Sequence, residues 1–288
     1  MADTMIRFTD NKLSEKFLSH EELMARCPHA FKEEPTNPNV SGKYVQANTM
    51  TVINDLAKLG WYPVEAKQCK TKKNSSGVRS FHMIALQNPD IKIMKNNADG
   101  TQTVDAYPRI IMTNSHDGFN SFKFILGCLR LICSNGLVVC DDQMVNMSIR
   151  HINYTFDELR HIVAIAIKQI PDIVNTMNKM RTIELSDVNK KELAKEMFKI
   201  RKNLDESDQI EVSDEVLEDI LTPVREEDNK NDLWTIFNIC QEKMIKGGFS
   251  ANTKNNKLRK QRGITSIKKN IDYNQRLWGA ASKYLMAA

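Results

Sequence analysis

The spacing of apolar residues changes near Thr155. Before that point, short runs such as "WYPVEAKQCK" and "VRSFHMIALQN" alternate between apolar and polar residues, and a period of two is typical of β-strands. After it, apolar residues recur every three or four positions almost throughout, as in amphipathic helices. The sequence therefore predicts an α+β fold. We expect a small antiparallel sheet with a helix-strand-strand-strand-helix core, followed by a mostly helical C-terminal half.

The first helix of this core is expected between Thr49 and Gly60, where apolar residues have helical spacing. Thr49 or Thr51 can cap its first turn, and Gly60 can end it. Strands are then expected within residues 61–70, 78–88 and 105–115. The turns between them are the basic loop "TKKNSSG" and a second turn that contains Asp99-Gly100, a common hairpin dipeptide.

The stretch from Pro108 to Cys140, "PRIIMTNSHDGFNSFKFILGCLRLICSNGLVVC", continues the sheet region. Apolar residues between positions 119 and 133 recur at steps of three and four, which predicts a helix over 118–133. Asn135-Gly136 would end this helix, because both residues tolerate a left-handed backbone. Two short strands are expected on either side of Asp141-Asp142.

The polar residues Ser115, His116 and Asp117 precede this expected helix. A catalytic interpretation would make Ser115 a nucleophile, His116 its base and Asp117 the orienting acid. Consecutive residues point in different directions, however, whereas a triad needs a chain of hydrogen bonds between its members. We favour a capping role, in which Ser115 or Asp117 accepts from free N–H groups of the helix. Contact with a phosphate at the same helix end is the second alternative, and catalysis is the third.

Charge is distributed unevenly in the C-terminal half. Acidic residues dominate 205–228 against Arg225 alone, whereas after Lys243 basic residues face only Asp272. Such asymmetry indicates a polyanionic partner, or docking of the acidic stretch on the basic one. With the turn signals, it divides the chain into a polar N-terminal arm (1–43), an α+β core domain (44–153), a helical region (154–247) and a basic C-terminal tail (248–288).

The chain has 288 residues, six cysteines and a formal net charge of +5. None of the cysteines forms a CxxC pair, which indicates a reducing cytoplasm without a disulfide framework. The N-terminus lacks an apolar stretch of signal-peptide length, and no window approaches the ~20 apolar residues of a membrane span. His20, Cys27 and His29 do not have the spacing of a zinc site. We therefore expect a cytoplasmic protein with no membrane association, no metal and no cofactor.

Three motifs resemble those of the phage- and plasmid-like protein family known as domain of unknown function nine-three-two. They are the Asn-Ser-His-Asp-Gly element at 114–118, the Arg-Leu-x-Cys-x-Asn-Gly element at 130–136, and a later helix with Trp234 and Asn238. The likeness spans roughly Tyr44 to Gly248. It implies a mobile-element or phage origin, and hence a bacterial host cell, but it implies no reaction.

The expected order of helix, three antiparallel strands and long helix is also similar to the core of single-strand annealing proteins of the RecT, Erf and Rad fifty-two types. This topological resemblance implies a homo-oligomer that holds a single strand in a basic groove. We therefore expect a protein without catalysis that binds or anneals single-stranded DNA in replication or recombination. Cations would contact phosphate, and Trp61, Tyr62 and Tyr107 would support bases.

The expected phosphate contacts fall into three groups. They are Lys67, Lys70, Lys72, Lys73 and Arg79 on the basic hairpin, Arg109, Lys123 and Arg130 around the central helix, and Lys257, Arg259, Lys260 and Arg262 in the tail. One alternative is a metal-dependent nuclease or hydrolase that uses His116, Asp117 and Asp141-Asp142. Another is a phage protein that binds a host or virion protein. In this last case the acidic 205–228 stretch could mimic nucleic acid or mask the basic tail.

Overall fold

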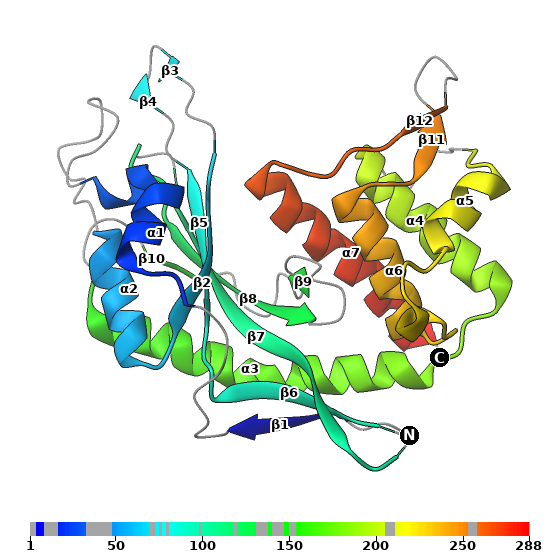
Figure 1. The fold of residues 1–288 in the computed structure, drawn as a ribbon, viewed down its shortest axis with the longest axis horizontal. Coiled ribbons are helices and arrows are strands. Elements are labelled where there is room, and N and C mark those ends of the chain that lie inside the picture. Colours follow the sequence, from blue (N-terminus) through cyan, green and yellow to red (C-terminus); the bar gives the residue numbers. More distant parts are fainter. Residues whose placement is uncertain are drawn as a thin grey trace.

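The computed structural model describes residues 4–8, 17–32, 48–69, 73–74, 77–78, 81–97, 99–117, 120–130, 138–139, 147–149, 154–204, 211–252 and 258–287. An antiparallel sheet forms one half of the molecule and a group of helices forms the other (Figure 1). The long helix α3 (Phe156–Thr182) runs from the sheet half to the helical half. The α+β class and the mostly helical C-terminal half are thus confirmed.

The main sheet follows the order β1-β6-β7-β5-β2. The long strand β7 pairs with β6 near its start and with β5 near its end, and β8 pairs along its opposite edge. Its strands are β1 (Thr4–Phe8), β2 (Tyr62–Gln68), β5 (His82–Gln87), β6 (Ile91–Asn96), β7 (Gln102–Asn114), β8 (Phe122–Arg130), β9 (Val138–Val139) and β10 (Met147–Ile149). All the pairings are antiparallel. A separate ladder joins β3 (Lys73–Asn74) to β4 (Gly77–Val78) at the expected basic hairpin.

The helix predicted over 118–133 is wrong, because residues 122–130 form strand β8. Phe122, Phe124 and Leu126 are buried on one face of this strand, and Ile125 is buried on the other. Both faces are therefore covered, and burial of both faces removes the simple alternation that marks a half-exposed strand. Because the run is almost continuously apolar, it also contains apolar residues spaced three and four positions apart, and this spacing led to the wrong prediction of a helix. The expected helix stop at Asn135-Gly136 lies outside the described residues.

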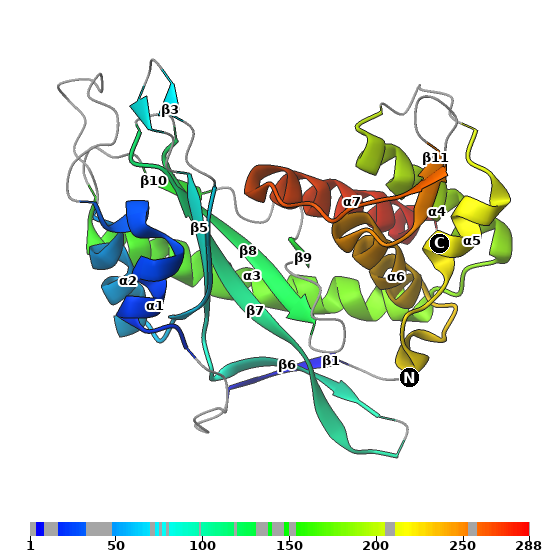
Figure 2. The ribbon, with the colours of Figure 1, turned by 45° about the horizontal axis from the view of Figure 1, so that its top comes forward.

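Opposite faces of the sheet pack against different elements. One face buries Ile84, Ile110 and Phe124 in the main core together with α2 (Thr49–Lys58) and α3. The other face carries a smaller cluster of Met83, Ala85, Ile111 and Ile125, closed by Ile267 and Ile271 of α7 (Ile267–Ala287). Figures 1 and 2 show α2 and α7 on opposite sides of the sheet. The sheet therefore separates the main core from the smaller apolar cluster that packs against α7.

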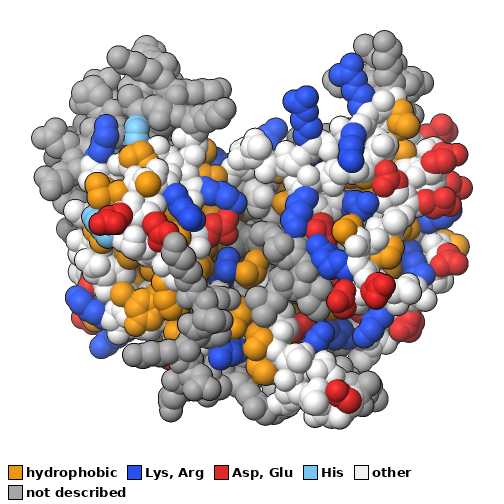
Figure 3. Space-filling model, in the orientation of Figure 1, with side chains coloured by type: hydrophobic (Ala, Val, Ile, Leu, Met, Phe, Trp, Pro, Cys, Tyr) orange, Lys and Arg blue, Asp and Glu red, His pale blue; other side chains and the backbone are white. Residues whose placement is uncertain are grey.

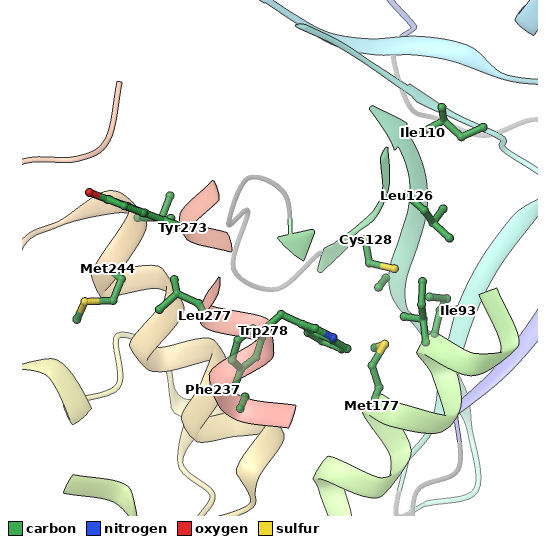
Figure 4. Close-up of a cluster of buried hydrophobic side chains, with 14 of the residues drawn as sticks. Ile93, Ile110, Leu126, Cys128, Met177, Phe237, Met244, Tyr273, Leu277 and Trp278 are labelled. Carbon is green, nitrogen blue, oxygen red and sulfur yellow. The ribbon is translucent and has the colours of Figure 1, made fainter. Parts of the chain in front are cut away.

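The expected basic tail is part of the folded body. Trp278 and Leu277 of α7 are buried against Phe237 of α6, and the Trp278 indole points toward Met177 of α3 and Cys128 of β8 (Figure 4). This packing makes the core continuous between the two halves. The other described elements here are α4 (Asp187–Lys202), α5 (Asp214–Leu221), η2 (Glu226–Asp228), α6 (Leu233–Lys246), β11 (Ser250–Asn252) and β12 (Leu258–Lys260).

Helix ends follow local rules. The Thr155 hydroxyl accepts from the Glu158 N–H at the start of α3, as expected. Asn48, rather than a threonine, caps α2, and Gly60 follows that helix with a φ of +83°. The described part of the polar N-terminal segment also contributes structure, since α1 (His20–Arg26) begins with a capping box and η1 (Pro28–Phe31) follows it. β1, from the same segment, pairs with β6.

Candidate functional site

A pocket of about 200 Å³ lies between the sheet and the first turns of α7. Its floor includes Ile125 on β8 and Ile271 on α7, and its rim carries Lys123 and Lys268. Figure 3 shows a notch in the outline between the two halves, with lysine and arginine side chains gathered along its helical side. We call this pocket and the adjoining sheet face the groove. It combines an apolar floor with a cationic rim.

Sheet register explains how side chains far apart in sequence reach the groove. Lys67 on β2 lies opposite Met83 on β5, Met83 lies opposite Thr113 on β7, and Thr113 lies opposite Lys123 on β8. Directly opposite residues in an antiparallel sheet project to the same face. One row across four strands therefore has a lysine at each end and smaller or apolar residues between them. This is the face that α7 only partly covers.

Lys268 of α7 closes one side of the pocket. Its ammonium group donates to Oδ1 of Asn120 at 2.8 Å and lies 4.6 Å from the centre of the Phe81 ring. Phe81 is half-buried and packs against the smaller apolar cluster. Among the described residues that line the pocket, the aromatic side chain is Phe81, which no pattern in the sequence indicated. Trp61 and Tyr107, which were expected to support bases, are buried, and Tyr62 packs against Phe17.

The Ser115–Asp117 element lies beneath this pocket as a buried turn. Ser115, His116 and Asp117 are 0%, 0% and 3% exposed. Because β8 is a strand, the expected role as cap of a following helix is wrong. Instead, the Ser115 hydroxyl donates to Asp117 and accepts from the Asn120 amide at 2.8 Å. The element therefore supports Asn120, which in turn accepts from Lys268.

His116 belongs to the same buried turn but faces the main core. Its Nε2 shares a hydrogen bond of 3.0 Å with the Thr49 hydroxyl of α2, and its ring stacks on that of His82 at 5.4 Å. The serine therefore bonds to Asp117 and Asn120, and the histidine bonds to Thr49. These contacts do not form the ordered chain from nucleophile to base to acid that a catalytic triad requires.

Arg109 differs from the other expected cations because it is only 7% exposed. It donates to Gln87 at 3.1 Å and lies 3.6 Å from a Glu65 carboxylate oxygen. Glu65 also pairs with the exposed Lys67 at 2.5 Å. Arg109 is therefore held inside the sheet face and cannot be a primary phosphate contact. Lys67 and Lys123 remain accessible on that face.

The remaining expected cations are placed as follows. Arg259 and Lys260 are exposed on β12, and Arg262 is exposed just after it. Only the backbone positions of Lys73 and Arg130 are described, on β3 and β8. Lys70, Lys72, Arg79 and Lys257 lie outside the described residues.

The β11–β12 hairpin stands on a tightly packed base. The Gly248 N–H donates to the Gln261 carbonyl at 2.9 Å, and the Ile264 N–H donates to Ile245 at 2.8 Å. Gly247 has a φ of +76°, and a Cβ there would lie 2.7 Å from the Arg262 carbonyl carbon. The close approach fixes the position of the exposed cations of this hairpin relative to α6.

Acidic side chains gather away from the groove. Lys191 of α4 pairs with Asp214 at 2.9 Å, and Lys243 of α6 lies 3.5 Å from Asp219. Figure 3 shows the acidic side chains at the outer edge of the helical half, beyond the basic ones. Acidic residues of α5 thus pair with lysines of the neighbouring helices α4 and α6. Among the described residues, His, Cys, Asp and Glu side chains form no group that could hold a metal ion. Asp141 and Asp142 lie outside the described residues.

Residues 39–278 match the family described as "Domain of unknown function (DUF932)". The chain belongs to this family. The resemblance inferred from the Asn-Ser-His-Asp-Gly element is therefore confirmed, and the family segment includes every residue that lines the pocket. The family description states no activity.

Two relatives that align with this chain over nearly their whole length come from Escherichia coli (strain K12). The chain is 27% identical over 270 residues to the "UPF0380 protein YafZ", covering 93% of this chain and 92% of the relative. It is 26% identical over 268 residues to the "UPF0380 protein YfjQ", with the same coverage of 93% and 92%. No solved structure matches the chain. None of the helices described here is long and apolar enough to cross a membrane.

Proposed function

We propose that this protein binds single-stranded nucleic acid in the groove and acts without catalysis in DNA replication or recombination. Its further roles would be strand annealing and self-assembly into a homo-oligomer. The main support is the row that ends in Lys67 and Lys123, together with Lys268 on the opposite wall. Lysine ammonium groups attract phosphate oxygens, and an apolar floor between them suits the faces of bases.

The size of the groove favours a single strand. The part of the groove between β8 and α7 is a pocket of about 200 Å³. Protein modules that bind single strands combine a basic track with aromatic or apolar platforms, and they do not need to span a duplex. The β11–β12 hairpin, with exposed Arg259 and Lys260, extends the basic surface beyond the pocket. A strand that leaves the groove along the helical half would meet these cations.

A hydrolytic function has less support. Metal-dependent nucleases need convergent carboxylates. Asp272 is the acidic residue among those that line the described pocket, and it pairs with Arg276 at 3.7 Å. Asp117 is buried and accepts from Ser115. A protein-binding role would use the acidic edge of α5, where Asp214 and Asp219 already pair with Lys191 and Lys243.

The decisive experiment is a titration of labelled single-stranded oligonucleotide at two salt concentrations. We expect wild-type affinity to fall steeply with salt, because each phosphate contact releases counterions. The double variant Lys123→Gln/Lys268→Gln should lower the slope of log affinity against log salt by about 1.4, or about 0.7 for each lost contact. Lys168→Gln removes an exposed cation from α3 and is the matched control. Absent binding, or equal slopes for the double variant and the control, would refute the proposal.

A further inference from the structure

Resting on the proposed function, we propose that the pocket between β8 and α7 is a single-nucleotide subsite in which a base stacks on Phe81 and its phosphate lies between Lys123 and Lys268. The unassigned feature behind this inference is the Phe81–Lys268 pair. It joins a strand-flanking residue of the sheet to the first turn of the last described helix. Both residues line the same pocket.

Phe81 has the environment of a stacking platform. Phe81 is partly buried and packs against the cluster that contains Met83 and Ile125, which restricts the positions its ring can adopt. The Lys268 ammonium lies 4.6 Å from the ring centre. A phenylalanine in this position is backed by the core and covered on the groove side by a flexible, exposed lysine. Such a cover can move away without disturbing the core.

Displacement of the Lys268 ammonium group from the Phe81 ring by a base is energetically favourable. An exposed ammonium–ring contact is among the weaker interactions of an aromatic side chain, whereas a base contributes a larger stacking energy and leaves less of the ring in water. The displaced ammonium stays within reach of the same nucleotide and can pair with its phosphate. Lys268 therefore covers the ring when the pocket is empty and binds the phosphate when it is filled.

The buried turn beneath the pocket has a defined part in this exchange. Asn120 accepts from Lys268 through Oδ1 and donates to Ser115 through Nδ2. When Lys268 moves to the phosphate, Oδ1 of Asn120 becomes available to accept from the amino or imino edge of the base. The Ser115 contact keeps this amide oriented. The Asp272 carboxylate, half exposed in the same pocket, keeps the phosphate on the lysine side by repulsion.

The test uses an oligonucleotide that contains 2-aminopurine, whose fluorescence falls when it stacks on an aromatic ring. Phe81→Leu should weaken binding about tenfold and remove the quenching, since stacking on one side chain is lost. Phe81→Tyr should keep both. The matched control is Phe156→Leu, because Phe156 is a second partly exposed phenylalanine with a lysine, Lys58, 5.6 Å from its ring centre. That variant should bind and quench like wild type.

Failure of this inference is distinct from failure of the proposed function. If wild type binds in a salt-dependent way but Phe81→Leu binds and quenches equally, the subsite is refuted and the groove proposal stands. If wild type does not bind, both are refuted.

Asn120→Asp provides a second readout that leaves the aromatic packing intact. A carboxylate there holds Lys268 on the ring and repels phosphate, so affinity should fall several-fold, and wild-type affinity would overturn the inference.

Discussion

Arg181, at the end of α3, donates to the carboxylate of Asp105 in β7 at 2.6 Å. The same guanidinium lies 5.3 Å from the ring centre of Trp234 in α6. Asp105 is 1% exposed, so the ion pair is shielded from water on the acidic side. Three elements, one from the sheet, one from the connecting helix and one from the helical half, therefore meet at one arginine. This contact links the sheet to the helical half through α3.

Arg181→Ala should destabilise the fold by about 3 kcal/mol, because it leaves a buried carboxylate without its cation. The measurement is the free energy of unfolding from urea denaturation. Arg160→Ala is the matched control, since Arg160 pairs with Asp157 at 3.5 Å on the surface of the same helix. Its loss should cost less than about 1 kcal/mol. Equal effects of the two changes would contradict the view that the Asp105 contact ties the halves together.

Glu242 predicts a pH dependence of stability. Burial alone would raise the pKa of Glu242, but hydrogen bonds and charge from Arg225 and Lys246 outweigh burial and hold that pKa below its ordinary value. Arg225 donates to both oxygens of Glu242 at 2.7 Å. A carboxylate with a lowered pKa stabilises the fold above its unfolded-state pKa, and this contribution is lost as pH falls through the folded-state pKa.

The thermal midpoints of wild type and Glu242→Gln should therefore differ most near pH 7 and converge as the pH falls below about 4. Differential scanning calorimetry across this range gives the comparison. The double change Arg225→Gln/Glu242→Gln removes both charges and should not show the same convergence with wild type. A gap that stays constant, or widens in acid, would mean that Glu242 is not the titrating group.

The cysteines should differ in reactivity. Burial raises the pKa of the Cys27 and Cys240 thiols to about 12, so both should resist alkylation in the folded protein. Burial also raises the pKa of Cys69, opposed by the Ile267 N–H and the charge of Lys268, but Cys69 is partly exposed beside the groove. We expect Cys69 to be alkylated before the two buried thiols, and faster as pH rises toward its pKa. Mass spectrometry of tryptic peptides gives the order.

Oligonucleotide should slow the alkylation of Cys69 and leave the slow reaction of Cys27 unchanged, because Cys69 packs against the same apolar cluster as Phe81. Cys69→Ser identifies the labelled peptide. Protection of both thiols to the same degree would indicate general stabilisation of the fold rather than occupation of the groove.

Gly247→Ala should destabilise the base of the β11–β12 hairpin by about 2 kcal/mol or more, because its φ of +76° is strained for alanine and the added Cβ meets Arg262. Gly279→Ala, in α7, is the matched control. A Cβ there meets nothing within 4 Å, so helix propensity should make that change neutral or stabilising by up to about 1 kcal/mol. Urea denaturation measures both. Similar behaviour of the two variants would show that the hairpin base can adjust.

Elements marked by local signals were predictable from sequence. Helical spacing and Gly60 located α2, although Asn48 rather than a threonine caps it, and Thr155 marked the start of α3. The Asp99-Gly100 turn was located before β7, but the strand that precedes it, β6, was not expected. β8 was not predictable in the same way, since apolar residues cover both of its faces and hide its period. The burial of α7 was hidden by the lysines and arginines on its exposed side, which made residues 248–288 look like a tail.

The groove itself could be predicted only in part. Lys123 stood out in the sequence, but its partner across the pocket, Lys268, is brought to it by tertiary folding alone. Phe81 gave no signal, because its position depends on α7 lying over the sheet. Arg109 looked accessible, and only the sheet register places it beside Glu65 and Gln87. Charge counts identify basic residues, but they cannot show which of them share a surface.

The dependence of the groove on α7 has a consequence for biosynthesis. α7 supplies one wall of the groove through residues such as Lys268 and Ile271, and the link between the two halves through Trp278, and it is synthesised after the strands of the sheet. A ribosome-bound chain that has not yet extruded these residues exposes the apolar strip of β5, β7 and β8. Translation of α7 is therefore the step that both shields this apolar strip from aggregation and completes the groove.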